Sequence, residues 1–206
     1  MCFSATASFT ASAVLGVVGA ATLGKTKNKR AWLLSAVPLL FALQQFTEGL
    51  LWVSLDRWPT YTLPLTHVFL FFALFVWPIY TPLMILLLEP SKIRRIIIGF
   101  FLAGGIVVGT MFYLNYLTSP EVARVLNRCL YYPTHIFQPE SLKYLYIVVT
   151  VGSGLISSRM IAKLFCLLVL VGSVITWVFY TVNFTSVWCF FAATISVVLY
   201  LQPQKD

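Results

Sequence analysis

Long runs of apolar residues alternate with short polar gaps along the whole of this 206-residue chain. A helix needs roughly 20 mostly apolar residues to cross about 30 Å of hydrocarbon. The runs lack the strict alternation of a membrane β-barrel, and open sheets cannot satisfy their backbone polar groups in lipid. The pattern therefore predicts an all-α bundle of seven transmembrane helices, at approximately 6–24, 31–54, 63–88, 93–116, 141–158, 160–181 and 184–201.

Composition agrees with this pattern, because 60% of the residues are hydrophobic and only 10% are charged, whereas a soluble domain carries about 25% charged residues. No linker or low-complexity segment divides the chain, so we expect residues 1–206 to form one domain in the lipid bilayer. The one long connection, at about 117–140, is predicted to lie on the outer face. Its segment EVARVLNRCLYY fits a short amphipathic helix, with one side formed by Val122, Val125, Leu126 and Cys129.

Positive charges predict the orientation, since Lys and Arg of short loops stay on the cytoplasmic side. Ten of the fourteen Lys and Arg residues fall in the gaps after helices one, three and five or in the C-terminal tail. The opposite gaps hold Arg57, Arg124, Arg128 and Lys143. The chain is therefore predicted to be a multi-pass protein of the plasma (inner) membrane, with its N-terminus outside and its C-terminus inside.

The net charge of +8 is thus a topology signal, and we expect no nucleic-acid partner because the cations border the spans instead of forming one basic face. Residues 19–26, GAATLGKT, match the phosphate-loop pattern. The match begins inside an apolar helix and ends in a basic cluster, so we expect no nucleotide site there. Cys2 and Cys129 both fall on the outer side, which leaves a disulfide between them open.

Small residues spaced four apart indicate where helices approach closely. Ser12, Gly16 and Ala20 form one such stripe in the first predicted helix, and Gly105 and Gly109 form another in the fourth. Both stripes are expected to pack against neighbouring helices.

Glu48 is the one acidic side chain deep within a predicted span, and a carboxyl there is costly unless it is paired. Gln44 and Gln45 precede it by four and three residues and Trp52 follows it by four, which places all four on one helical face. We expect this face to point into the bundle and Glu48 to be enclosed by protein. His67 lies at a similar depth in the next span, so we expect Gln44, Gln45, His67 or segment 2–8 within hydrogen-bond reach of Glu48.

An outward-opening polar pocket around Glu48 is the predicted site, with Glu48 and His67 as catalytic candidates. Serines recur every four residues at the start of the chain, and this stripe is expected to hydrogen-bond to the Glu48 face. The candidate ligand-binding residues are Cys2, Ser4, Gln44, Gln45, Trp52 and Tyr113.

Each candidate also has a structural interpretation. Glu48, Gln44 and Gln45 fit a hydrogen-bonded knot that joins two helices, and His67 fits an interfacial histidine. Cys2 could act as an N-terminal nucleophile only after removal of Met1.

Three segments, MCFSATASF, LLFALQQFTEGLLW and FALFVWPIYTPL, resemble an uncharacterised family of small prokaryotic integral-membrane proteins. The resemblance covers about the first 90 residues, including a QQxxEG motif in the second helix. It implies no activity, but it implies that this half of the chain holds the common site. The residues that it favours for testing are Cys2, Phe3, Ser4, Gln44, Gln45, Glu48, Gly49, Trp52, Trp77 and Pro78.

These patterns favour a membrane-embedded enzyme, or a binder of a lipid or small amphiphilic ligand, with Glu48 as general base or metal ligand and His67 as its partner. A small transporter or proton-coupled carrier is the first alternative, although no inverted repeat is evident. The second is a non-catalytic receptor or assembly subunit that uses the 117–140 connection. The patterns assign no cofactor, metal or oligomeric state.

The predicted orientation can be tested with reporter fusions. Fusions after residues 28, 92 and 159 are expected to report the cytoplasm, and fusions after 58 and 128 the outside, because ten cations border the first set of gaps and four the second. The measurement is the activity of paired reporters, one active only in the cytoplasm and one only outside. An external signal at residue 28 would contradict the prediction.

Overall fold

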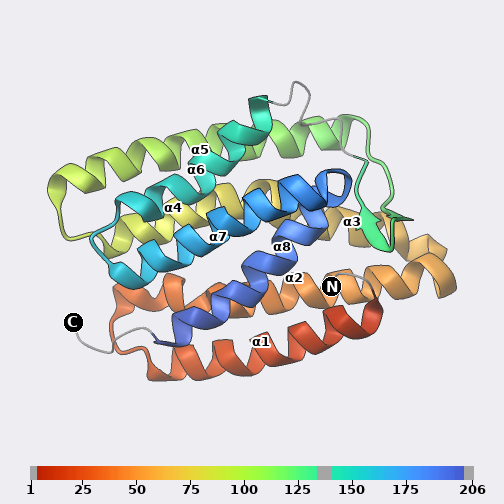
Figure 1. The fold of residues 1–206 in the computed structure, drawn as a ribbon, viewed down its shortest axis with the longest axis horizontal. Coiled ribbons are helices and arrows are strands. Elements are labelled where there is room, and N and C mark those ends of the chain that lie inside the picture. The colour runs from red at the N-terminus through yellow and green to blue at the C-terminus, as the bar shows by residue number, and fades with distance from the viewer. Residues whose placement is uncertain (1–3, 134–140, 202–206) are drawn as a thin grey trace.

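The apolar runs fold as helices in the computed structural model, which describes residues 4–133 and 141–201. In this part of the chain the helices form seven rods packed side by side (Figure 1). The rods are α1 (Ala5–Lys25), α2 (Trp32–Arg57), α3 (Thr62–Leu70) continued by a π-helical segment (Phe71–Val76) into α4 (Trp77–Leu88), α5 (Lys92–Thr118), α6 (Ser141–Ile156), α7 (Met160–Phe179), and α8 (Phe184–Ile195) continued by a 3₁₀ segment (Ser196–Leu201).

The predicted all-α bundle of seven helices is confirmed. Among the described residues, six of the rods are long and apolar enough to cross a membrane, which marks the chain as a multi-pass membrane protein. The seventh, α6, has a shorter apolar stretch at Leu142–Ile156.

The connections sort to the two ends of the bundle. Figure 1 shows the links α1–α2, α4–α5 and α6–α7 at one end, which we call the cationic end because Lys and Arg flank all three. The links α2–α3, α5–α6 and α7–α8 lie at the other, which we call the hairpin end. Such a sorting of charge is what the predicted orientation requires, and the membrane side of each end stays a prediction.

The 117–140 connection differs from the prediction. Its described part forms a β-hairpin of β1 (Arg124–Leu126) and β2 (Cys129–Tyr131) instead of an amphipathic helix. Asn127 and Arg128 have positive φ values of 52° and 60°, the backbone that a two-residue hairpin turn needs and that asparagine tolerates. The predicted helix is wrong, and its proposed apolar side does not exist as one face: Cys129 is buried, whereas Val122, Val125 and Leu126 are exposed.

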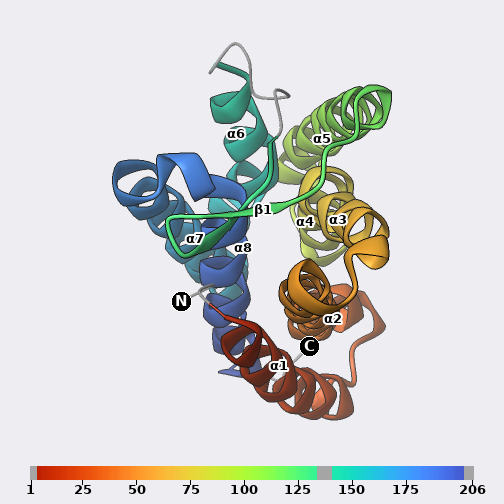
Figure 2. The same cartoon turned by 90° about the vertical axis from the view of Figure 1, so that its right-hand side faces the viewer.

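The hairpin lies across the hairpin end of the bundle (Figure 2). The side-chain amide of Asn183 donates to the backbone oxygens of Leu126 and Leu130, at 3.1 and 3.3 Å. On the other side, Tyr132 stacks on Phe69 with ring centroids 4.6 Å apart. These contacts join the hairpin to both α3 and the α7–α8 connection.

Two breaks in the backbone hydrogen bonding shape the rod formed by α3 and α4. Trp77 N–H donates to Phe72 O within the π-helical segment, which frees Ala73 O to accept a hydrogen bond from the Tyr146 hydroxyl of α6. Pro82 has no N–H to offer Pro78 O one turn earlier. The α5 backbone packs onto that oxygen at Gly105, where a Cβ atom would collide with it.

The small-residue stripes have different outcomes. Gly105 and Gly109 pack against α4 and the π-helical segment, as expected. In α1 the expected position was wrong, because a Cβ at Gly16 would meet nothing within 4 Å. The close approach of α1 to α2 occurs instead at Gly19, under Leu39.

We predict that Gly105→Ala lowers the stability of the bundle by about 1–3 kcal/mol, because the added methyl group overlaps the Pro78 carbonyl. Gly99→Ala, on the same helix, is the matched control, since its Cβ enters open space and alanine is the better helix former. Thermal unfolding of the purified proteins in detergent measures both. Equal melting temperatures would contradict the proposed packing.

Candidate functional site

Glu48 is completely buried, at 0% exposure, at a contact between α2 and α8. One carboxylate oxygen, Oε1, accepts a hydrogen bond from the Ser186 hydroxyl at 2.6 Å. The other, Oε2, accepts from Gln45 Nε2 at 3.1 Å. The expectation that Glu48 is enclosed, with Gln45 within reach, is confirmed, and Ser186 is a partner that the sequence did not indicate.

Gln44 links the same face of α2 to α4. Its side-chain oxygen Oε1 accepts a hydrogen bond of 2.7 Å from the indole Nε1 of Trp77. The Trp77 ring also stacks on Phe41, one turn earlier on α2, with centroids 3.9 Å apart. Consecutive turns of α2 therefore hold α4 through Gln44 and α8 through Glu48.

Several buried polar atoms beside Glu48 have no hydrogen-bond partner in the described part of the chain. They are Ser8 Oγ, Gln44 Nε2, Gln45 Oε1 and Trp52 Nε1. A buried polar atom without a partner costs roughly 1–3 kcal/mol, so their concentration in one region is notable. We call Ser8, Gln44, Gln45, Glu48, Trp52 and Ser186 the Glu48 cluster.

The serine stripe of α1 does not make the expected bonds to Gln44, Gln45 and Glu48. Ser12 donates to the backbone oxygen of Ala42 instead, at 2.8 Å. The Ser4 side chain accepts from Ala7 N–H and so caps the start of α1. Cys2, and with it the disulfide to Cys129 that the sequence left open, lies outside the described residues.

Two other predicted site residues are placed elsewhere. His67 of α3 is partly exposed, and its ring meets Tyr116 edge-on with centroids 5.1 Å apart. Tyr113 of α5 packs edge-on against Phe71, at 5.4 Å. The structure thus does not bring His67 or Tyr113 into hydrogen-bond contact with Glu48, which is bonded to Gln45 of α2 and Ser186 of α8.

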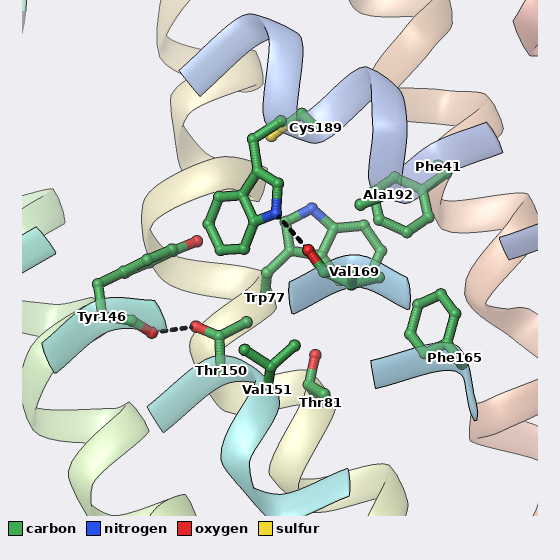
Figure 3. A pocket seen from close by; sticks show the side chains of 11 residues that line it. Phe41, Trp77, Thr81, Tyr146, Thr150, Val151, Phe165, Val169, Cys189 and Ala192 are labelled. Carbon is green, nitrogen blue, oxygen red and sulfur yellow. Dashed lines mark hydrogen bonds between the residues drawn. The ribbon is translucent and has the colours of Figure 1, made fainter. Parts of the chain in front are cut away.

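A small, partly open cavity, with about 30 Å³ of room for the centres of water-sized molecules, lies beside the Glu48 cluster. We call it the aromatic cavity (Figure 3). The indole N–H of Trp188 is hydrogen-bonded within the protein, because Nε1 donates to Val169 O at 3.1 Å. The cavity is lined by Phe41, Trp77, Thr81, Tyr146, Thr150, Val151, Phe165, Val169, Trp188, Cys189 and Ala192.

The cavity and the cluster adjoin along two helices. On α2, Phe41 lines the cavity and Glu48 lies seven residues further on, about 10 Å at 1.5 Å per residue. On α8, Ala192 lines the cavity and Ser186, six residues earlier, binds Glu48. This cavity differs from the predicted outward-opening polar pocket, because it is mostly apolar and Glu48 is not part of its wall.

Metal ligation finds no support in residues 4–133 and 141–201, where no three His, Cys, Asp or Glu side chains gather closely enough to hold an ion.

A second buried carboxylate, Glu89, lies at the cationic end, just after α4. It is only 3% exposed, and it accepts from Ser158 N–H at 2.7 Å, Ser158 Oγ at 2.5 Å, Ser157 Oγ at 3.1 Å and Ser91 N–H at 3.2 Å. Desolvation raises the pKa of Glu89, but these hydrogen bonds outweigh it, so the pKa lies below its usual value of 4.5. Glu89 thus joins the α4–α5 and α6–α7 connections.

The chain belongs to a family of unknown function, DUF6629, whose model matches residues 1–206. The resemblance to an uncharacterised family is thereby confirmed and extends beyond the first 90 residues. No curated protein and no solved structure gives a significant match.

We predict that Glu89 stabilises the bundle in a pH-dependent way. Because its folded pKa is lowered, its contribution is complete above the unfolded value of about 4.5 and is lost as the pH falls through the folded value. Glu89→Gln is expected to cost roughly 1–3 kcal/mol at neutral pH, since its amide presents N–H groups to the donors of Ser158.

The test compares melting temperatures in detergent between pH 3 and pH 7. Asp56→Asn, which alters an exposed carboxylate at the end of α2, is the matched control and is expected to melt like the unmodified protein. A Glu89→Gln protein that keeps the full acid sensitivity would contradict the prediction.

Proposed function

We propose that this member of the DUF6629 family binds a lipid-like or other small amphiphilic molecule inside its membrane bundle, with the apolar part of the ligand in the aromatic cavity. The observation that carries the proposal is a ring-lined, partly open space beside a buried carboxylate. Ligand sites in proteins are typically concave and mostly apolar, with a few placed polar groups.

The chemistry of the wall supports an apolar occupant. The indole N–H groups of Trp77 and Trp188 are both bonded within the protein. The Thr150 hydroxyl is likewise bonded to Tyr146 O, at 2.7 Å. These side chains therefore present ring faces and methyl groups to the space, and burial of hydrocarbon against them is favourable.

The Glu48 cluster supports a polar end for the same ligand. It lies along α2 and α8 from the cavity, in the direction of the hairpin end. If the cations mark the cytoplasmic side, as we propose, the polar end of the ligand points outward and the apolar end inward.

Binding is better supported than catalysis by a Glu48–His67 pair. The hydrogen bonds of Glu48 are made with Ser186 and Gln45, and the ring of His67 packs on Tyr116. A general base has to reach the proton that it removes, and the two residues share no such contact.

We predict that Ala192→Phe, which adds a ring to the cavity wall, abolishes ligand entry. The probe is 1-bromododecane, because bromine quenches the fluorescence of tryptophans that it touches and Trp77 and Trp188 line the cavity. The unmodified protein in detergent should show a saturable quenching component, and its apparent affinity should fall at least tenfold in the variant.

The control is Ala103→Phe, an equal increase in size at an exposed position of α5, and it should quench like the unmodified protein. Unchanged saturable quenching in a folded Ala192→Phe protein would refute the proposal.

A further inference from the structure

We infer that the ligand carries a hydroxyl group, as an alcohol or polyol does, and that Gln44 and Gln45 hold this group at the edge of the aromatic cavity. The inference rests on the proposed function and names the chemical class of the ligand's polar end. It starts from the buried atoms of the Glu48 cluster that the described protein leaves without partners.

These atoms include both donors and acceptors. Gln44 Nε2 and Trp52 Nε1 are donors, Gln45 Oε1 is an acceptor, and Ser8 Oγ can be either. The side chains of Ser8, Gln44 and Gln45 are fully buried, so bulk water does not reach them.

Neither glutamine can turn to find another partner without losing the one it has. Gln44 Oε1 is held by the Trp77 indole, which fixes the direction of Nε2 on the same amide. Gln45 Nε2 is held by Glu48, which likewise fixes Oε1. The pair therefore presents one fixed donor and one fixed acceptor on neighbouring residues of α2.

The mixture of donors and acceptors does not suit an ion. A metal ion or an ammonium group would satisfy the acceptor oxygens but would leave Gln44 Nε2 and Trp52 Nε1 without an acceptor. A carboxylate or phosphate would lie beside the Glu48 carboxylate in an apolar region, where two like charges repel strongly. A neutral hydroxyl donates one hydrogen bond and accepts others, which matches the set.

The positions of Gln44 and Ser8 relative to the aromatic cavity agree with this assignment. Gln44 follows the cavity residue Phe41 by three positions, and its partner Trp77 is itself part of the cavity wall. Ser8 faces this region from α1, because Ser12 bonds to Ala42 and the Phe9 ring lies against Gly49. Gln44 therefore adjoins the cavity wall through Trp77, and the unpartnered atoms lie behind that wall.

The experiment compares four probes with the same twelve-carbon chain: 1-dodecanol, dodecane, dodecylamine and dodecanoate. Each is titrated against the full-length protein in detergent, and displacement of 1-bromododecane quenching gives its affinity. We expect 1-dodecanol to bind about tenfold more tightly than dodecane, the factor that corresponds to one net hydrogen bond, and also more tightly than the two charged probes.

Two variants test the assigned residues. Ser8→Ala removes a hydroxyl that has no hydrogen-bond partner in the described protein, so it should melt no lower than the unmodified protein. Gln45→Met keeps the size of the side chain and removes the amide. Each is expected to reduce the preference for 1-dodecanol over dodecane, taken as the ratio of the two affinities in the same variant, to less than about threefold.

The outcomes separate this inference from the proposed function. Equal displacement by 1-dodecanol and dodecane would overturn the hydroxyl assignment and leave the cavity as a binding site for hydrocarbon. Tightest binding of dodecylamine would overturn it in favour of Glu48 as a counter-ion. A preference for 1-dodecanol that survives both variants would also overturn it. Absence of saturable displacement by every probe would refute the proposed function itself.

Discussion

The structure depends on the burial of one carboxyl group, that of Glu48, in the middle of an apolar bundle. Lipid and hydrocarbon side chains cannot solvate such a group, so its burial requires hydrogen-bond donors from the protein. Gln45 supplies one from the same helix, and Ser186 supplies the other from α8, 138 positions later in the chain. This requirement holds the last helix against the second, and the aromatic cavity lies where these two helices meet α4, α6 and α7.

Backbone carbonyl groups inside the bundle also depend on the protein for hydrogen-bond donors or close packing. The π-helical segment leaves Ala73 O without its usual helical donor, and the Tyr146 hydroxyl of α6 takes its place. Pro82 leaves Pro78 O without a donor, and α5 packs closely onto it because residue 105 is a glycine. Breaks in the hydrogen-bonding of the α3–α4 rod are therefore places where neighbouring helices attach, as expected where lipid cannot compensate.

The sequence predicted what depends on local composition and periodicity. Span positions follow from the lengths of apolar runs, and the inward face of α2 follows from the three- and four-residue spacing around Glu48. Ser186 was missed because serine is common in membrane helices, and only the tertiary pairing of α2 with α8 distinguishes it. Glu89 was missed because it lies beyond the end of a span and is buried by another connection.

The hairpin was missed for a different physical reason. Its apolar residues fit a helical spacing, and the positive φ angles at Asn127 and Arg128 are set by the fold as a whole. His67 and Tyr113 were assigned to the site by depth, and depth does not specify the direction in which a helix faces. Their rings face the aromatic contacts between the α3–α4 rod and α5.

The two buried carboxylates show how a structural role differs from a candidate binding role. Glu89 accepts four hydrogen bonds, about as many as a carboxylate can take, and all of them come from serines that fix two connections. Glu48 accepts two, and the atoms around it include donors and acceptors with no partner in the described protein. If Glu48 served only to join helices, the hydroxyl of Ser8 and the indole N–H of Trp52, which have no partner in the described protein, would lose nothing by being apolar. Their retention beside a ring-lined cavity is accounted for by a ligand that completes their hydrogen bonds, and this is why the region around Glu48, and not the better satisfied Glu89, is the candidate site.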